Sequence, residues 1–149
     1  MEYQNYTTQQ GPETDIFHQE RIQYGTFWER FAAAFIDGLI LMIPNLILRY
    51  GIGDVTGELL NIVVNWLYFA MMESGTNQAT FGKKAMNLKV TNTEGHRISF
   101  GQATGRYFGK IISAIILLIG YLMMLWDDKK QTLHDKMANT LVVKNIAAF

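Results

Sequence analysis

An arginine and an aspartate, Arg30 and Asp37, stand seven residues apart at the start of a long apolar stretch. Two turns of an α-helix would separate them, so both side chains would share one face, about 10 Å apart along the axis. A charge near the middle of a membrane helix costs roughly 2.5–3.5 kcal/mol, and such residues are rare without a function. Asp37 is therefore interpreted either as a proton or cation ligand, or as a structural group that bonds to a neighbouring Asn or Arg.

A polar stripe lies in the second apolar stretch. Asn61, Asn65 and Tyr68 recur there at the spacing of one helix face. Such groups bond across helices in a membrane. We predict that this stripe faces Asp37 and forms an ion or proton site with it. The alternative is that the stripe only holds two helices together.

A cationic face begins the third apolar stretch, where Arg106, Lys110 and Ser113 lie at helical spacing. Arg106 is the best candidate counter-ion for an acid at the cytoplasmic interface. Lys110 is expected to reach toward the near interface. The alternative is that these cations set the topology and contact anionic lipid headgroups.

Three apolar segments must position these residues, at 27–48, 59–72 and 107–126. The first and the third reach the roughly 20 residues that a spanning helix needs, whereas the second is short. We therefore predict an all-α fold of about three transmembrane helices. The polar residues 1–26 are predicted to form a disordered tail.

The distribution of Lys and Arg predicts the orientation. Six of these residues lie in the connection 73–110 and four in 127–149, whereas the connection 49–58 has one. The positive-inside rule therefore predicts a cytoplasmic N-terminus and a cytoplasmic second connection, with the short first connection outside.

The side on which the C-terminus lies stays open. Residues 87–99 have the alternation and turn signal of a β-hairpin and 140–144 read as a strand, which predicts a small cytoplasmic β element. These strands can pair only if both lie on one side of the membrane. The third segment would then be re-entrant and bent near Gly120, with both ends inside, which is tolerated where protein covers the backbone. A single crossing by the same segment is the alternative.

The remaining composition argues against several functions. The formal net charge is zero, which gives no attraction to nucleic acid, and the chain has no cysteine. The run F-G-K-K-A at 81–85 lacks the spacing of a phosphate loop, and the three histidines lack metal-ligand spacing. His134 and Asp135 are adjacent, and adjacent residues rarely face each other on a helix. We therefore expect no enzyme activity, no cofactor and no metal site.

Three blocks of sequence are distinctive when taken together. They are R-F-A-A-A-F-I-D at 30–37, T-F-G-K-K-A-M-N-L-K-V at 80–90 and K-Q-T-L-H-D-K-M-A-N-T-L-V-V at 130–143. In this order they resemble the RDD family of small multi-pass bacterial membrane proteins. The resemblance implies that Arg30 and Asp37 are the first two residues of the family's name, with Asp135 as the further aspartate. Asn87 and Asn139 stand where the family would have glycine, and both can adopt its left-handed conformation.

This resemblance implies a membrane domain at 27–144, followed by a short tail at 145–149, in the bacterial cytoplasmic membrane. We further predict that residues 80–106 and 131–143 form a cytoplasmic cap over the opening between the helices. The candidate residues of this cap are Lys83, Arg106, His134 and Asp135.

The resemblance permits two functional hypotheses, because some members of the family are proposed cation/proton antiporters. In the first, the protein is an ion- or proton-coupled transporter that uses Asp37. Three short segments are too few for alternating access, so this transporter would have to be an oligomer. In the second, it is a non-transporting scaffold or accessory subunit in which Arg30 and Asp37 form a structural pair. The expected partners are the lipid bilayer and either further copies of the chain or other membrane proteins, without nucleic acid.

Overall fold

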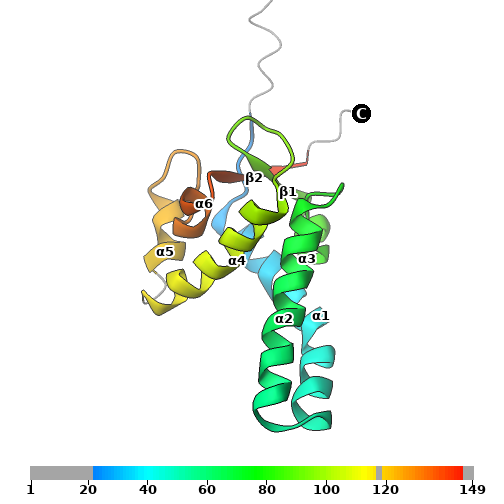
Figure 1. The fold of residues 1–149 in the computed structure, drawn as a ribbon. Helices are drawn as coiled ribbons and strands as arrows, with labels where there is room; N and C mark the ends of the chain where they lie inside the picture. Colours follow the sequence, from blue (N-terminus) through cyan, green and yellow to red (C-terminus); the bar gives the residue numbers. More distant parts are fainter. Residues whose placement is uncertain (1–21, 117–118, 146–149) are drawn as a thin grey trace, which may run out of the picture.

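Two long antiparallel helices, α1 (Phe27–Gly51) and α2 (Asp54–Ser74), dominate the computed structural model, which describes residues 22–116 and 119–145 (Figure 1). A capping box begins α1. Most of the large apolar side chains of both helices are exposed rather than packed inside. The second helix is 21 residues long, because it begins upstream of its apolar run. Both are long and apolar enough to cross a membrane.

The third predicted span is not a single helix. α4 (Phe100–Ile115) is followed by α5 (Ile119–Leu122) and the 3₁₀ helix η2 (Met123–Leu125), and the axis bends by 117° between them. A Cβ on Gly120 would lie 2.8 Å from the Cβ of Ser113, so glycine lets α5 come close to α4. The bent pair is either one broken span or a re-entrant segment, so the described residues contain two candidate membrane-spanning helices, or three if this pair counts as one span.

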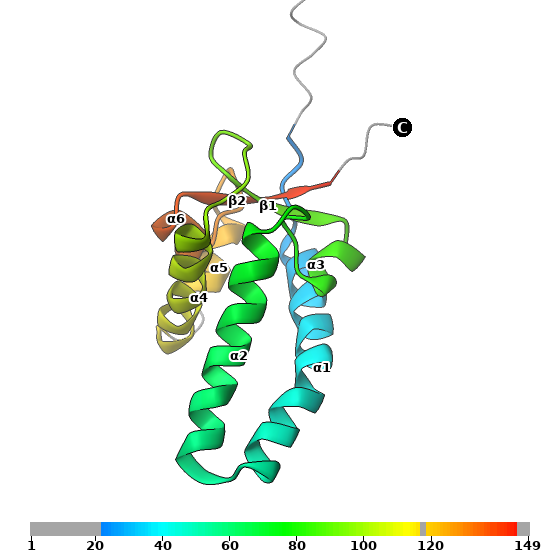
Figure 2. The ribbon, with the colours of Figure 1, turned by 45° about the vertical axis from the view of Figure 1, so that its right-hand side comes forward.

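A two-stranded antiparallel sheet lies at the end where α1 begins and α2 ends (Figure 2). β1 (Leu88–Asn92) pairs with β2 (Thr140–Lys144) along its whole length. The predicted hairpin at 87–99 has only one bridge to its return strand, between Thr91 and Arg97. Since β1 and β2 flank the third apolar segment and pair with each other, both ends of that segment lie at the sheet. This agrees with the re-entrant alternative.

The residues just before α1 extend the sheet. Gly25 donates its N–H to a carbonyl of β2 at 2.9 Å, and Lys144 donates to the carbonyl of Gln23 at 2.8 Å. The last residues of the predicted disordered tail are therefore ordered along the free edge of β2. Residues 1–21 and 146–149, from the two predicted tails, lie outside the described residues.

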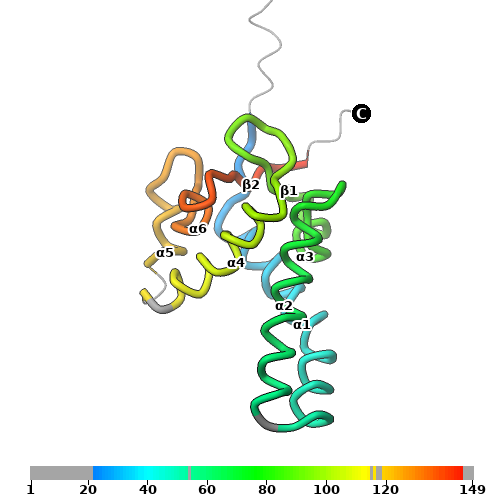
Figure 3. The backbone as a smooth tube through the Cα atoms, viewed as in Figure 1, coloured from blue at the N-terminus to red at the C-terminus, as the bar shows by residue number. Residues whose placement is uncertain are grey.

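The chain repeats one order of elements. The first run consists of α1, α2, α3 (Phe81–Ala85) and β1. The second run has the same order, with α4, α5 with η2, α6 (Leu133–Met137) and β2. Figure 3 shows the backbone of both runs. Each five-residue helix follows a threonine, Thr80 or Thr132. The helix α3 packs on α1, and α6 packs on α4 in the same way. The molecule therefore consists of two halves joined by the sheet.

The turn from the short helix to the strand also recurs. Asn87 has a φ of 53° and Asn139 a φ of 52°, each directly before its strand. This confirms the expectation that asparagine keeps the left-handed turn. Two helix segments also align with each other when their arginines are superposed. They are R-F-A-A-A-F-I-D, which begins at Arg30 in α1, and R-Y-F-G-K-I-I-S, which begins at Arg106 in α4. The two arginines thus occupy equivalent positions in α1 and α4.

Candidate ligand-binding site

Asp37 is buried in α1 and accepts three hydrogen bonds. The donors are the Tyr68 hydroxyl at 2.7 Å, the Thr80 hydroxyl at 2.6 Å and the backbone N–H of Gly82 at 2.8 Å. Three donors suit an ionised carboxylate, whereas a bound cation needs several oxygen acceptors around it. Asp37 therefore joins α1 to both α2 and the start of α3.

Two residues of the predicted polar stripe of α2 contact different parts of α1. Tyr68 reaches Asp37, but Asn61 and Asn65 do not, which corrects the prediction for these two residues. Asn65 donates to the Asn45 side chain of α1 at 3.0 Å and to the Asn61 carbonyl at 2.6 Å. Asn45 lies about 12 Å beyond Asp37 along α1. Asn65 therefore links the two helices, which is the alternative stated for the stripe.

Arg30 does not pair with Asp37. Its guanidinium donates to Asp135 and, at 2.6 Å, to the carbonyl of Lys130. Arg106 donates to the other oxygen of Asp135, so equivalent arginines of the two halves hold one aspartate. Burial by itself would raise the pKa of Asp135, but Arg106 and then Arg30 hold it well below its usual value. Asp135 is thus an anionic bridge between the halves.

Glu73, which was not predicted from the sequence, is the third carboxylate of the site. It is buried at the end of α2 and accepts from Arg106 at 2.9 Å, Lys83 at 2.6 Å and Lys110 at 3.4 Å. Arg106 therefore pairs with two acids, Glu73 and Asp135. The sequence did contain a signal for Glu73, because it directly follows the apolar run at 59–72. A carboxylate at the end of such a run needs a partner as much as one inside it.

His134 lies beside this network as a neutral ring. Its Nε2 is 3.0 Å from the Thr132 hydroxyl, and the ring meets Tyr121 edge to face, with centroids 5.2 Å apart. Burial lowers the pKa of His134 to about 3, although the Asp135 carboxylate opposes this shift. The four predicted cap residues therefore lie together, and His134 is uncharged near neutral pH.

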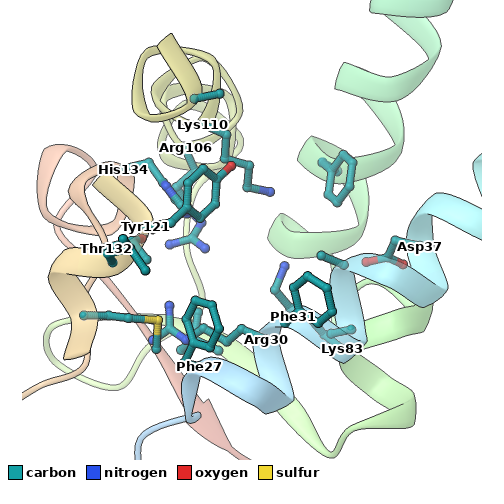
Figure 4. Close-up of a pocket in the computed structure, with 17 residues that line it drawn as sticks. Phe27, Arg30, Phe31, Asp37, Lys83, Arg106, Lys110, Tyr121, Thr132 and His134 are labelled. Carbon is teal, nitrogen blue, oxygen red and sulfur yellow. Dashed lines mark hydrogen bonds between the residues drawn. The ribbon is translucent and has the colours of Figure 1, made fainter. Parts of the chain in front are cut away.

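A cavity of about 510 Å³ lies among α1, α4 and α5 (Figure 4). Its cationic lining residues are Arg30, Lys83, Arg106 and Lys110, and its aromatic ones are Phe27, Phe31, Phe69 and Tyr121. The carboxylates of Glu73 and Asp135 pair with these cations from outside the lining. An entering molecule would therefore meet positive charge and aromatic surface.

The charges around the cavity do not balance. The four lining cations are opposed by three carboxylates, those of Asp37, Glu73 and Asp135, which leaves one positive charge in excess. Lys110 has the longest of these ion pairs: its ammonium is 3.4 Å from the Glu73 oxygen that Lys83 approaches to 2.6 Å. It also lies 4.1 Å from the centre of the Phe69 ring. Because a charge taken out of water without a partner is costly, the cavity suits an anion.

Comparisons with known proteins identify relatives of the chain. The family model described as "RDD family" matches residues 24–139. The "Uncharacterized protein YxaI" of Bacillus subtilis (strain 168) is 38% identical over 144 residues, which cover 78% of this chain and 95% of that protein. No solved structure matches the chain significantly.

Two further relatives are similar over different lengths. The "Uncharacterized membrane protein YteJ" of Bacillus subtilis (strain 168) is 28% identical over 139 residues, which cover 80% of each protein. A "Proline-rich antigen homolog" of Mycobacterium tuberculosis (strain ATCC 25618 / H37Rv) is 39% identical over 88 residues, which cover 58% of this chain and 35% of that protein. The family match includes Asp37 and Asp135, so it spans the whole charged site.

Proposed function

This chain belongs to the RDD family of membrane proteins, and on that premise we propose that it binds an anionic molecule in the cavity between its two halves. The observation that carries the proposal is the excess positive charge, which is centred on Lys110 because Lys83 already occupies the shared oxygen of Glu73. Membrane proteins built from repeats often bind their ligands between the repeats, which supports this location.

The proposed activity is binding without covalent chemistry. The Ser113 hydroxyl lies 3.5 Å from His134 Nδ1, but it donates to the carbonyl of Gly109 at 2.8 Å. A nucleophile needs a base that removes its proton, and an engaged hydroxyl beside a histidine of low pKa does not meet this need. These contacts support a binding protein rather than an enzyme.

Cation transport through Asp37 receives less support from the geometry. A cation would have to displace the Tyr68 and Thr80 hydroxyls, which both donate to this carboxylate. Arg30 and Asp37 belong to separate sets of contacts, so we propose a structural role for each. The anion site itself would serve an oligomeric transporter or an accessory subunit. Flux of a bound anion into proteoliposomes separates these two roles.

We propose that the sheet faces the cytoplasm of a bacterial cell. Six Lys and Arg residues in 73–110 and four in 127–149 belong to the segments that flank the sheet, against one in 49–58. The positive-inside rule supports a cytoplasmic location for the segments with more of these residues. Since α1 begins beside the sheet, the chain before it would be cytoplasmic as well.

Anion binding by the purified protein in a neutral detergent tests the proposed function. The titrants are inorganic phosphate and phosphatidic acid, and the variant is Lys110→Gln. The matched control is Lys84→Gln, because Lys84 is exposed on α3 next to Lys83.

We expect the wild type to bind at least one of the two titrants. Lys110→Gln should weaken this binding about tenfold or more, since a hydrogen bond to a charged group contributes roughly 1.5–3 kcal/mol. Lys84→Gln should leave it unchanged. No binding of either titrant, or equal binding by all three proteins, would overturn the proposal.

A further inference from the structure

The exposure of the lining residues changes from the floor of the cavity to its mouth. On the floor, Arg106 is 1% exposed and Lys83 is 8% exposed. At the mouth, Phe31 is 57% exposed and Leu122 is 38% exposed. In a membrane protein, charged groups face the interior and apolar side chains face lipid. The charged floor is therefore reached through an apolar mouth, which suits a ligand that comes from the bilayer.

The mouth also lies at a suitable depth. Phe31 is four residues after the start of α1, which corresponds to about 6 Å along the helix axis. The headgroup region on each side of a bilayer is roughly 5–7 Å thick. Phe35 and Ile119, on α1 and α5, are more than half exposed next to these lining residues. The mouth is therefore expected at the boundary between headgroups and hydrocarbon.

We infer that the cavity takes the head of an anionic phospholipid, which enters sideways from the bilayer between α1 and α5. This inference rests on the proposed anion binding and adds the class of ligand and its route. The phosphate would lie near Lys110, between the charged ends of Lys83 and Arg106. The acyl chains would pass Phe31 and Leu122 and remain in the bilayer.

The chemistry of the floor fits a phosphate head. In Figure 4, the charged ends of Lys83, Arg106 and Lys110 point toward one open space. Guanidinium and ammonium groups together offer many donors to phosphate oxygens. One bound monoanion would neutralise the excess positive charge of the site. Basic pockets between membrane helices on the cytoplasmic side bind lipid headgroups by this chemistry.

The first test separates a lipid from a free phosphate. The wild-type protein in a neutral detergent is titrated with phosphatidic acid and with glycerol 3-phosphate, which is the water-soluble form of the same head. Phosphatidylcholine with the same acyl chains is the control for apolar contact alone. We expect phosphatidic acid to bind at least tenfold more tightly than either of the other two molecules.

The second test closes the mouth without changing any charge. Ala114 lines the cavity and is exposed, so Ala114→Phe would narrow the opening. Ala85→Phe is the control, because Ala85 is exposed on α3 and is not part of the lining. We expect Ala114→Phe to weaken phosphatidic acid binding at least fivefold and Ala85→Phe to leave it unchanged.

The outcomes distinguish this inference from the proposed function. If glycerol 3-phosphate binds as tightly as phosphatidic acid, the lipid inference is wrong while anion binding stands. If phosphatidylcholine binds as tightly as phosphatidic acid, the charged head is not recognised and the inference is wrong. If Ala114→Phe binds phosphatidic acid like the wild type, the sideways route is wrong. If neither phosphate compound binds, the lipid inference is wrong, and if inorganic phosphate also fails to bind, both proposals are overturned.

Discussion

At the residue scale, the two buried aspartates accept hydrogen bonds from different kinds of donor. Asp37 accepts from uncharged donors, so it fixes the start of α3 against α1. Asp135 accepts from Arg30 and Arg106, so it links the two halves through opposite charges. Breaking a buried ion pair by removing one partner typically costs about 3–5 kcal/mol. Substitutions of Arg30 or Arg106 would therefore disturb folding, which is why Lys110 is the better probe of binding.

Asp37→Asn is expected to destabilise the protein. The amide oxygen can still accept from Tyr68 and Gly82, but the NH₂ group would face the Thr80 hydroxyl, which loses its acceptor. An unsatisfied buried polar group costs about 1–3 kcal/mol. We expect a lower melting temperature in detergent and less protein in the membrane. Asp128→Asn is the control, since Asp128 is exposed. Wild-type stability together with lost ion flux would instead support the transport hypothesis for Asp37.

His134 is expected to make stability depend on pH. Folding lowers its pKa from 6.5 to about 3, so below pH 6.5 the unfolded chain takes up a proton that the folded protein does not. The contribution of the neutral ring is therefore complete above pH 6.5 and is lost as the pH falls toward 3. At about 1.4 kcal/mol per pH unit, the loss reaches roughly 2 kcal/mol at pH 5.

Melting temperatures between pH 7.5 and pH 5 check this dependence. The wild type should lose stability over this range, and His134→Gln should lose clearly less, whatever its stability at pH 7.5. His96→Gln is the control, because His96 is exposed and should keep the wild-type slope. The same slope in the wild type and His134→Gln would contradict a buried neutral ring.

At the scale of elements, close backbone approach decides how the short helices dock. A Cβ on Gly109 of α4 would lie 2.9 Å from the Cβ of His134 on α6. On the other half, α3 presents Gly82 to the backbone of Ala33 in α1. One partner in each pair is a glycine, which allows the five-residue helices to lie close to the long ones.

Gly82→Ala is expected to displace α3. The added Cβ would overlap the carbonyl oxygen of Ala33 and lie 2.9 Å from the carboxyl carbon of Asp37. Overpacking of this kind typically costs about 1–3 kcal/mol, so the melting temperature should fall. Gly105→Ala is the control, because a Cβ there meets nothing within 4 Å, and alanine favours the interior of α4 by roughly 1 kcal/mol. Equal melting temperatures for the two variants would contradict the close docking of α3.

At the scale of the whole molecule, the two halves share an order of elements but differ in the length of their helices. The first half provides both candidate membrane-spanning helices, whereas the second turns back between α4 and α5. The sheet joins the halves at one end, and the charged cavity lies beneath it. This inequality is consistent with the sideways opening between α1 and α5 that we infer for the cavity.

Single-cysteine variants are expected to report this topology directly, because the chain has no cysteine of its own. The exposed positions are Thr56→Cys near the α1–α2 connection, and Glu94→Cys and Lys129→Cys beside the sheet. A membrane-impermeant maleimide should label Thr56→Cys in intact cells. It should label the other two only after permeabilisation, since β1 and β2 pair on one side. Labelling of Lys129→Cys in intact cells would instead indicate a single crossing by the third apolar segment.

Several features follow from the sequence by itself. The length of the first apolar segment predicted α1. The helical spacing of the polar residues in the second segment placed Tyr68 on the face of α2 that meets Asp37. The strand pattern at 140–144 corresponds to β2, and the left-handed turn at Asn139 was expected from its residue type. These are local properties, because they depend on residues close together along the chain.

Only the tertiary structure decided the partners. Arg30 pairs with Asp135, which is 105 residues away, rather than with Asp37. Asn65 meets Asn45, and Glu73 gathers three cations from other elements. Helical periodicity defines which residues share a face, but it does not define how far a helix is rotated or shifted against its neighbour. That depends on long-range packing, so the charged cavity is a property of the folded molecule.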